Sequence, residues 1–224
     1  MAGTVKYHGV GKCTFMSIAT EKPAAAGPFG DAVHEHYSRL LEGMARAVAA
    51  KGYAETTIAD IVREAAVSRR TFYEHFTTKA ECLIALYEAA SKLALRAVSE
   101  AFDPAQPWHA QVERAMSAYF DYLAQDPVLL RTLFVEILGL GMPGLAARRR
   151  VNDEIASFIQ LAINGGGSQE GPAAHLTSEM AMTVVGGINE LVLQAIEQDQ
   201  AGSLGQLVAP ATRLVRAVAA ESLR

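Results

Sequence analysis

Residues 57–79 read TIADIVREAAVSRRTFYEHFTTK, which is the pattern of two short helices joined by a tight turn. Thr57 is an N-cap candidate, and Asp60 three residues later can reach back to the free amides of the first turn. An apolar stripe at helical spacing follows at Ile58, Ile61, Val62 and Ala65. Ala66 and Val67 interrupt this stripe, so the first short helix is expected to end there.

A second short helix is expected after the turn, with Ser68 as its N-cap and with Phe72 and Phe76 forming an apolar back. Its other positions carry Arg69, Arg70, Thr71, Tyr73 and His75. Taken singly, each of these side chains fits a solvated face. Together they suit the major groove of DNA, because arginine pairs bidentately with guanine while hydroxyls, imidazole and a helix N-terminus suit phosphate. We expect Arg69, Arg70 and Thr71 to read base edges.

This region resembles the TetR family of one-component transcriptional repressors, over about residues 37–87. The resemblance is carried by Thr56-Thr57, the helix at 58–65, Val67-Ser68, Tyr73-Glu74-His75-Phe76 and Lys79. The family's matching positions imply that Tyr73, His75 and Lys79 contact the DNA backbone. The predicted DNA-binding residues are therefore Thr57, Ser68, Arg69, Arg70, Thr71, Tyr73, His75 and Lys79.

Two residues depart from the family pattern. Ala66 stands where the turn usually carries glycine, and a left-handed conformation there would cost alanine roughly 1 kcal/mol. We therefore expect a slightly different turn. Arg70 stands where the family often has glycine or a small residue, so it adds a charged reader, and the operator sequence cannot be taken from relatives.

The composition indicates a globular protein of one or two domains, since half of the 224 residues are hydrophobic and a fifth are charged. A net charge of −4 excludes a generic polyanion binder, so contact with nucleic acid must come from a local patch. The sequence has no apolar run near the length of a membrane span and no signal-peptide core. Cys13 and Cys82 lie far apart and are expected to be reduced thiols, which favours a cytoplasmic protein without a membrane partner.

The chain is predicted to be all-α, with three parts. Residues 1–29 have no sustained period and are expected to form a flexible arm, either solvated or following the DNA backbone. Residues 30–78 are expected to form a three-helix helix-turn-helix domain, whose first helix ends near Gly52. Residues 79–224 are expected to form a helical regulatory and dimerisation domain, entered by a long helix that ends near residue 101.

The middle helices of the third part are rich in aromatic residues and methionine. Such stripes are usually plain core. The family resemblance, however, implies a ligand cavity among them, and an apolar cavity with few polar groups suits a hydrophobic ligand. The candidate ligand-binding residues are Met116, Tyr119, Phe120, Phe134, Phe158, Met180 and Asn189.

The last two predicted helices, 173–198 and 203–222, each carry a long apolar stripe. Either stripe could serve the chain's own core, or the two could form a four-helix seam between two subunits. The resemblance favours the dimer, with candidate interface residues Val184, Val185, Ile188, Leu207, Leu214 and Val218.

These features predict a homodimeric repressor that binds a palindromic double-stranded DNA operator and is released by a small, hydrophobic effector. The alternative is an activator or architectural DNA-binding protein of the same fold without a ligand. An enzyme is not expected, because the sequence has no nucleophile elbow and no metal-ligand spacing or cofactor motif; no metal or cofactor is predicted.

Overall fold

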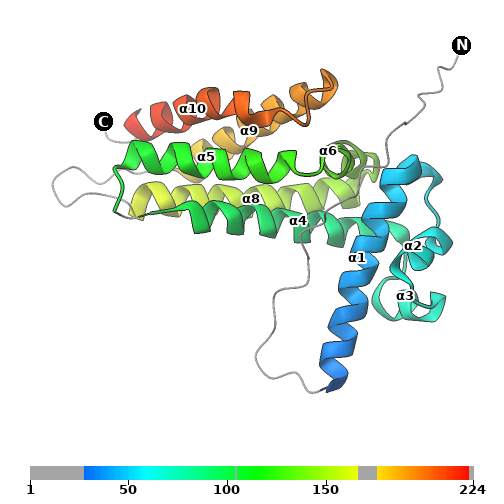
Figure 1. The fold of residues 1–224 in the computed structure, drawn as a ribbon. Coiled ribbons are helices and arrows are strands. Elements are labelled where there is room, and N and C mark those ends of the chain that lie inside the picture. The colour runs from blue at the N-terminus through cyan, green and yellow to red at the C-terminus, as the bar shows by residue number, and fades with distance from the viewer. Residues whose placement is uncertain (1–27, 104, 166–175, 222–224) are drawn as a thin grey trace, which may run out of the picture.

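The computed structural model describes residues 28–103, 105–165 and 176–221, and within these ranges the chain forms helices and no strand (Figure 1). The all-α prediction is confirmed. Most of the predicted N-terminal arm, residues 1–27, lies outside the described residues, as does Cys13. No helix within the described ranges is long and apolar enough to cross a membrane.

The N-terminal part consists of α1 (Pro28–Glu55), α2 (Ile58–Ala65) and α3 (Arg69–His75). The helical path of α1 is interrupted at Gly52, whose φ of 79° lies in the left-handed region, so the predicted break at this glycine is confirmed. The first helix packs closely on the second at Gly43. A Cβ atom there would lie 2.7 Å from the Ile61 carbonyl oxygen and 2.8 Å from the Ala65 Cβ. Only a residue without a side chain allows this approach.

The larger part is a bundle of long helices lying side by side, shown on the left of Figure 1. Its elements are α4 (Lys79–Ala101), α5 (Trp108–Ala124), α6 (Pro127–Arg131), the π-helix η1 (Thr132–Glu136), α7 (Ile137–Gly139), α8 (Met142–Gly165), α9 (Ser178–Glu197), the short 3₁₀ helix η2 (Leu204–Leu207) and α10 (Val208–Glu221). The fourth helix contacts α1 as well as α5 and α8, so it belongs to both parts of the molecule.

Two buried clusters form the core. One lies around α1, α2 and α3 and continues through Leu83, Leu86 and Tyr87 of α4 to Ile137 and Val151. The other lies among α5, α8, α9 and α10. The first cluster therefore crosses the boundary that we predict at residues 78 and 79. Because close-packed interiors transmit displacement, a movement of α4 reaches the helix-turn-helix through direct side-chain contact.

Candidate DNA-binding surface and core cavities

The turn between α2 and α3 is built around Ala66, which has φ 51° and ψ 44°. The amide of Ala66 donates to the Arg63 carbonyl at 3.2 Å, and the amide of Val67 donates to the Val62 carbonyl at 3.1 Å. These two bonds satisfy carbonyls at the end of α2. Our expectation of a different turn is wrong: alanine adopts the left-handed conformation in which glycine is usual.

Two arginines of α1 hold the carbonyl end of α2. Arg39 donates through Nε to the Ala65 carbonyl at 2.9 Å and through Nη2 to the Ala66 carbonyl, and Arg46 donates to the Glu64 carbonyl at 2.6 Å. Positive charge near a helix C-terminus is favourable, because the helix dipole is negative there. Sequence reasoning missed this pair, although a spacing of seven residues places both side chains on one face of α1.

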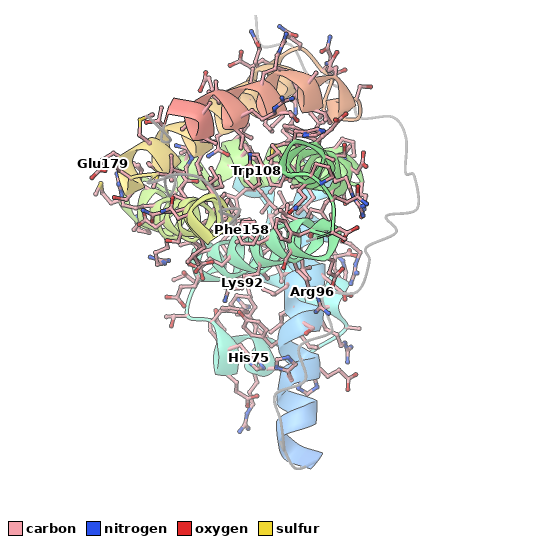
Figure 2. All side chains as sticks on the ribbon, turned by 90° about the vertical axis from the view of Figure 1, so that its left-hand side faces the viewer. His75, Lys92, Arg96, Trp108, Phe158 and Glu179 are labelled. Carbon is pink, nitrogen blue, oxygen red and sulfur yellow. The ribbon has the colours of Figure 1, made fainter. Side chains whose placement is uncertain are left out.

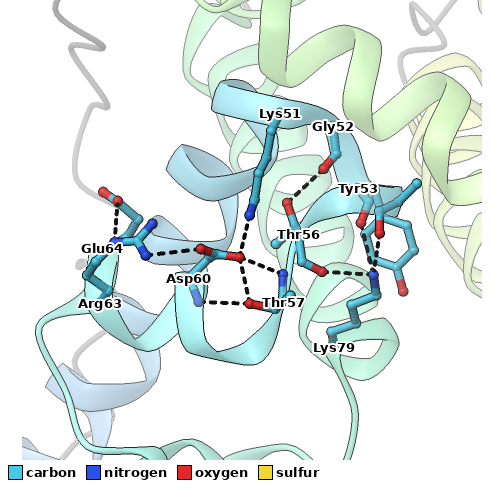
Figure 3. Close-up of polar contacts among 10 residues, drawn as sticks. Lys51, Gly52, Tyr53, Thr56, Thr57, Asp60, Arg63, Glu64 and Lys79 are labelled. Atoms are coloured by element: carbon cyan, nitrogen blue, oxygen red, sulfur yellow. Dashed lines mark hydrogen bonds and ion pairs between the residues drawn. The ribbon is translucent and has the colours of Figure 1, made fainter.

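The start of α2 is fixed by a capping box (Figure 3). Thr57 donates to Asp60 Oδ2 through its amide at 2.9 Å and its hydroxyl at 2.6 Å, and it accepts a bond from the Asp60 amide. Lys51 lies 2.6 Å from Oδ2, and Arg63 lies 3.0 Å from Oδ1. The hydrogen bond from Lys51, followed by those from Thr57, holds the pKa of Asp60 well below its usual range. The predicted N-cap role of Thr57 is confirmed.

Lys79, at the start of α4, ties α4 to the end of α1. Its ammonium group lies 3.0, 3.1 and 2.8 Å from the carbonyl oxygens of Tyr53, Ala54 and Thr56, and 4.4 Å from the centroid of the Tyr53 ring (Figure 3). An ammonium group has three protons, and these three bonds use all of them. The predicted phosphate contact of Lys79 therefore requires one of the three carbonyls to be released.

The third helix presents polar side chains on one side and buries Phe72 and Phe76 on the other. Ser68 caps it, accepting a hydrogen bond from the Thr71 amide at 3.0 Å. Ser68, Arg69, Arg70 and Tyr73 are exposed, whereas Thr71 and His75 are half-buried. Arg70 Nε lies 3.1 Å from Glu74 Oε1. The structure thus brings six of the eight predicted DNA-binding residues to α3 and its cap, while Thr57 and Lys79 lie at the starts of α2 and α4.

His75 is in contact with aromatic rings of α1 and α3. Its ring centroid lies 5.9 Å from that of Tyr37 and 6.3 Å from that of Phe76. Burial, and then the nearby His36, lowers the pKa of His75, while Glu74 acts in the opposite direction. The imidazole is therefore neutral at neutral pH in the free protein, and it can give phosphate a hydrogen bond but no full charge.

Two cavities of about 80 Å³ each lie within the helical bundle. The first is bordered by α4, α5, α6, η1, α8 and α9, and Tyr87, Tyr119 and Tyr122 bring three phenolic side chains to its wall. Burial raises the pKa of Tyr87 and of Tyr122 to about 12, so both hydroxyls keep their protons. Ser91, Asn152 and Asp126 add further polar side chains. The three phenols of this cavity can therefore donate hydrogen bonds to a group rich in acceptors, whereas the Asp126 carboxylate can only accept them.

The second cavity is almost wholly apolar. Its walls include Leu95, Val98, Trp108, Phe158, Ile159 and Val185. In Figure 2, which looks along the bundle, Trp108 and Phe158 lie among the bundle helices, above His75 of α3. Tyr119, Ile155 and Asn189 line both cavities. The two spaces therefore adjoin, with donor groups on one side and hydrocarbon on the other.

Five of the seven candidate ligand-binding residues line these cavities: Met116, Tyr119, Phe134, Phe158 and Asn189. The other two do not, and their selection is corrected. Phe120 is fully buried in the core among α5, α8, α9 and α10, and Met180 is 39% exposed on α9. Helical periodicity shows which side chains share a face, but it does not show whether that face meets a cavity, close packing or solvent.

The candidate dimer residues divide in a similar way. Val184, Val185 and Ile188 are buried in the chain's own core, so they are not available to a second subunit in this conformation. Their selection as interface residues is therefore corrected. The stripe was compatible with the chain's own core or with a seam between two subunits, and these three residues belong to the core. Leu207, Leu214 and Val218 are half-buried, and they stay candidates for an interface.

Comparison with known proteins supports the presence of a helix-turn-helix domain followed by a helical bundle. Residues 40–86 match the family model of bacterial regulatory proteins of the tetR family. The fatty acid metabolism regulator protein of Bacillus subtilis is 23% identical over 171 residues, covering 73% of this chain and 85% of that protein. The fatty acid degradation regulator FadR of Bacillus halodurans has a TM-score of 0.67 at 19% identity, covering 80% of this chain and 97% of that one. FadR of B. subtilis, solved in complex with stearoyl-CoA, has a TM-score of 0.64 at 20% identity, with the same shares covered.

A helix-turn-helix followed by a helical bundle is the architecture of bacterial one-component transcriptional regulators, and this chain is a DNA-binding transcriptional regulator of that class. Its residues 40–86 form a DNA-binding domain of the tetR family.

Proposed function

We propose that this regulator is a cytoplasmic homodimeric repressor that is released from a palindromic operator by a long-chain acyl molecule with an acceptor-rich head group. The observation that carries the ligand class is the pair of adjoining cavities. One offers phenolic donors, and the other is lined by hydrocarbon. An acyl thioester or carboxylate matches both, and a relative of the same fold has been solved with stearoyl-CoA.

We assign recognition of the operator bases to α3. Phe72 and Phe76 anchor its back in the core, while Arg69 and Arg70 extend from its exposed side. The side chain of Arg70 is 90% exposed, and its pairing with Glu74 is a surface ion pair of low strength. Arg70 can therefore exchange that partner for a guanine edge without uncovering a buried charge.

Communication between ligand and DNA is assigned to α4. Tyr87 and Ser91 of this helix line the first cavity, and Leu95 and Val98 line the second. The same helix begins at Lys79, which binds three carbonyls at the end of α1. A ligand that moves α4 therefore displaces the link between α1 and the helix-turn-helix. The ligand must bind the DNA-incompetent state more tightly, because equal affinity for both states shifts nothing.

The test is a fluorescence-anisotropy titration with the DNA that flanks the protein's own gene, with scrambled DNA as competitor. We expect specific, saturable binding by two subunits per site, followed by release on addition of stearoyl-CoA. Coenzyme A alone is the control and should leave the complex intact. Release by coenzyme A alone would contradict the role of the acyl chain. Specific binding that no acyl compound changes would favour an activator or architectural protein without a ligand.

The matched variants are Arg70→Ala and Arg149→Ala. Both remove an exposed arginine, one from α3 and the other from α8 in the bundle. We expect Arg70→Ala to weaken operator binding by about tenfold or more, the usual range for loss of one bidentate base contact. Arg149→Ala should leave the affinity unchanged. Equal operator affinities of the two variants would show that Arg70 does not contact the base edges.

A further inference from the structure

We propose that Trp108 sets the longest acyl chain that the two cavities accept, because it lies at the end of the apolar cavity farthest from the phenols. The inference rests on the proposed function, since it specifies which acyl molecules the regulator binds. It follows from the order in which the helices line the cavities, and from the contacts of the segment that joins α4 to α5.

The order of the lining residues along two helices shows which end of the apolar cavity is which. Tyr119 of α5 and Ile155 of α8 lie on the wall shared with the first cavity. From there the lining runs back along α5 to Trp108, the first residue of that helix, and forward along α8 to Ile163. Both helices therefore place the same end, at Trp108 and Ile163, away from the first cavity.

The fourth helix follows the same order and gives the length of the combined space. Tyr87 and Ser91 line the first cavity, whereas Val98 and Phe102 line the second. Because a helix rises 1.5 Å per residue, the path from Tyr87 to Phe102 is about 22 Å long. An extended hydrocarbon chain, with bonds of about 1.5 Å at a tetrahedral angle, advances about 1.25 Å per carbon. A chain of about 16–18 carbons therefore fills this length.

Two aromatic rings close the far end of the apolar cavity. Phe102 follows the last residue of α4 and is 37% exposed, so solvent begins directly beyond it. Trp108 is half-buried and packs against the core cluster of α5, α8, α9 and α10. Figure 2 faces the end of the bundle away from the DNA-binding part, and Trp108 lies there among the helices. The terminal carbons of a chain that fills the cavity therefore meet the indole ring.

The backbone that carries Trp108 is tied to α5. The Gln106 carbonyl accepts a hydrogen bond from Gln111 Nε2 at 2.6 Å. The Asp103 carboxylate lies 3.7 Å from the Arg114 guanidinium group. Both contacts attach the segment before Trp108 to the first turns of α5. A chain that is too long must therefore bend within the cavity or break these contacts, and either change lowers its affinity.

The expected dependence of affinity on chain length has two parts. While the added carbons still enter the apolar cavity, every two methylene groups should raise the affinity by about tenfold. Once the chain end reaches Trp108, further methylene groups overpack the site and the affinity should fall. The affinity should therefore pass through a maximum whose position depends on the size of residue 108.

The experiment measures the affinities of saturated acyl-CoAs from about 12 to about 22 carbons, which brackets the length given by the helix rise. Isothermal titration calorimetry is used on the full-length protein without DNA. We expect the maximum at about 16–18 carbons in the natural protein. Trp108→Ala should move it to chains at least about two carbons longer, because the truncated side chain leaves space that the chain end can fill. Trp108→Phe should move it less.

Phe158→Ala is the matched control, because it also removes an aromatic ring from the wall of the apolar cavity. Phe158 lies on α8 between Ile155 and Ile163, so it belongs to the side of the cavity and not to its end. This variant should weaken the binding of long chains but keep the maximum at the same length. Thermal unfolding of each variant without ligand checks that the fold is retained.

The outcomes separate the two proposals. Acyl-CoAs that bind with the same maximum in Trp108→Ala and in the natural protein would overturn the role of Trp108 and leave the acyl-ligand proposal standing. An affinity without a maximum in this range, or an equal shift in Phe158→Ala, would also overturn it. Failure of every acyl-CoA to bind the natural protein would overturn both proposals together.

Discussion

At the scale of single residues, Ala66 stores local strain in the turn of the helix-turn-helix. Its left-handed conformation, with φ 51°, is disfavoured for any residue with a Cβ. We expect Ala66→Gly to raise the free energy of unfolding by up to about 1 kcal/mol, with part of the gain offset by the greater freedom of glycine in the unfolded chain. Urea unfolding monitored by circular dichroism measures the change. A loss of stability would mean that the Ala66 side chain contributes packing that outweighs the strain.

Asp60 makes the stability of the same region depend on pH. Its folded-state pKa lies below the unfolded value of about 3.9, so its contribution is complete above that value and is lost as the pH falls toward the folded pKa. We expect Asp60→Asn to be less stable than the natural protein at neutral pH. The difference should shrink below about pH 4. Urea midpoints at a series of pH values test this, and a difference that grows on acidification would contradict the assignment.

The caps and the polar face of α3 could be predicted from single residues. Thr57 with Asp60, and Ser68 before Arg69, are local patterns that depend only on neighbouring positions. Bonds between distant positions could not be predicted in this way. Arg39 and Ala65 are 26 residues apart, as are Lys79 and Tyr53, and nothing in the local sequence indicates that these pairs meet.

At the scale of elements, the contact between α1 and α2 depends on Gly43. A Cβ atom at this position would meet the Ile61 carbonyl oxygen and the Ala65 Cβ, neither of which can rotate away. We expect Gly43→Ala to lower the free energy of unfolding by about 1–3 kcal/mol, the usual range for overpacking. Thermal or urea unfolding measures the effect.

Gly139→Ala on α7 is the control for that substitution, because nothing lies within 4 Å of the position that its Cβ would occupy. Alanine there should be neutral or stabilising, since it improves helix propensity. If Gly43→Ala proved as stable as Gly139→Ala, α1 and α2 would have to separate more easily than their packing implies.

Periodicity predicted most of the long helices but not their partners. The stripe of Val184, Val185 and Ile188 fits burial against either the same chain or a second copy. Helical periodicity shows only that one face of the helix is buried, and it does not show which surface covers that face. The secondary structure of the segment after Pro127 is harder to predict from the sequence. Its apolar run forms α6, the π-helix η1 and α7, and the extra residue per turn of a π-helix leaves no pattern that differs from that of an apolar helix.

At the scale of the whole molecule, the exposed sides of α9 and α10 are the surface that we assign to the dimer. The exposed residues of α9 include Gly186 and Glu190, and those of α10 include Arg213 and Arg216. A two-fold arrangement could therefore place the acidic helix of one subunit against the basic helix of the other. Half-buried Leu214 and Val218 would be covered at the same time.

We expect Gly186→Glu to convert the proposed dimer to monomers without unfolding them, because the position is open within one chain. Multi-angle light scattering gives the mass, and circular dichroism gives the helix content. The matched control is Gly139→Glu on α7, which is equally open and should stay dimeric. A dimeric Gly186→Glu would move the interface to another face.

Seven arginine and lysine side chains lie between residues 34 and 79: Arg39, Arg46, Lys51, Arg63, Arg69, Arg70 and Lys79. Within the described structure, all except Arg69 already bind a carbonyl or a carboxylate of the protein itself. The slope of log affinity against log salt is about −0.9 per phosphate neutralised, because each such contact releases condensed counterions. Because most of these cations are paired within the protein and the patch is only mildly basic, we expect this regulator to release few counterions and its operator affinity to fall moderately as ionic strength rises. Its occupancy of DNA would then follow the supply of ligand more closely than the salt content of the cell.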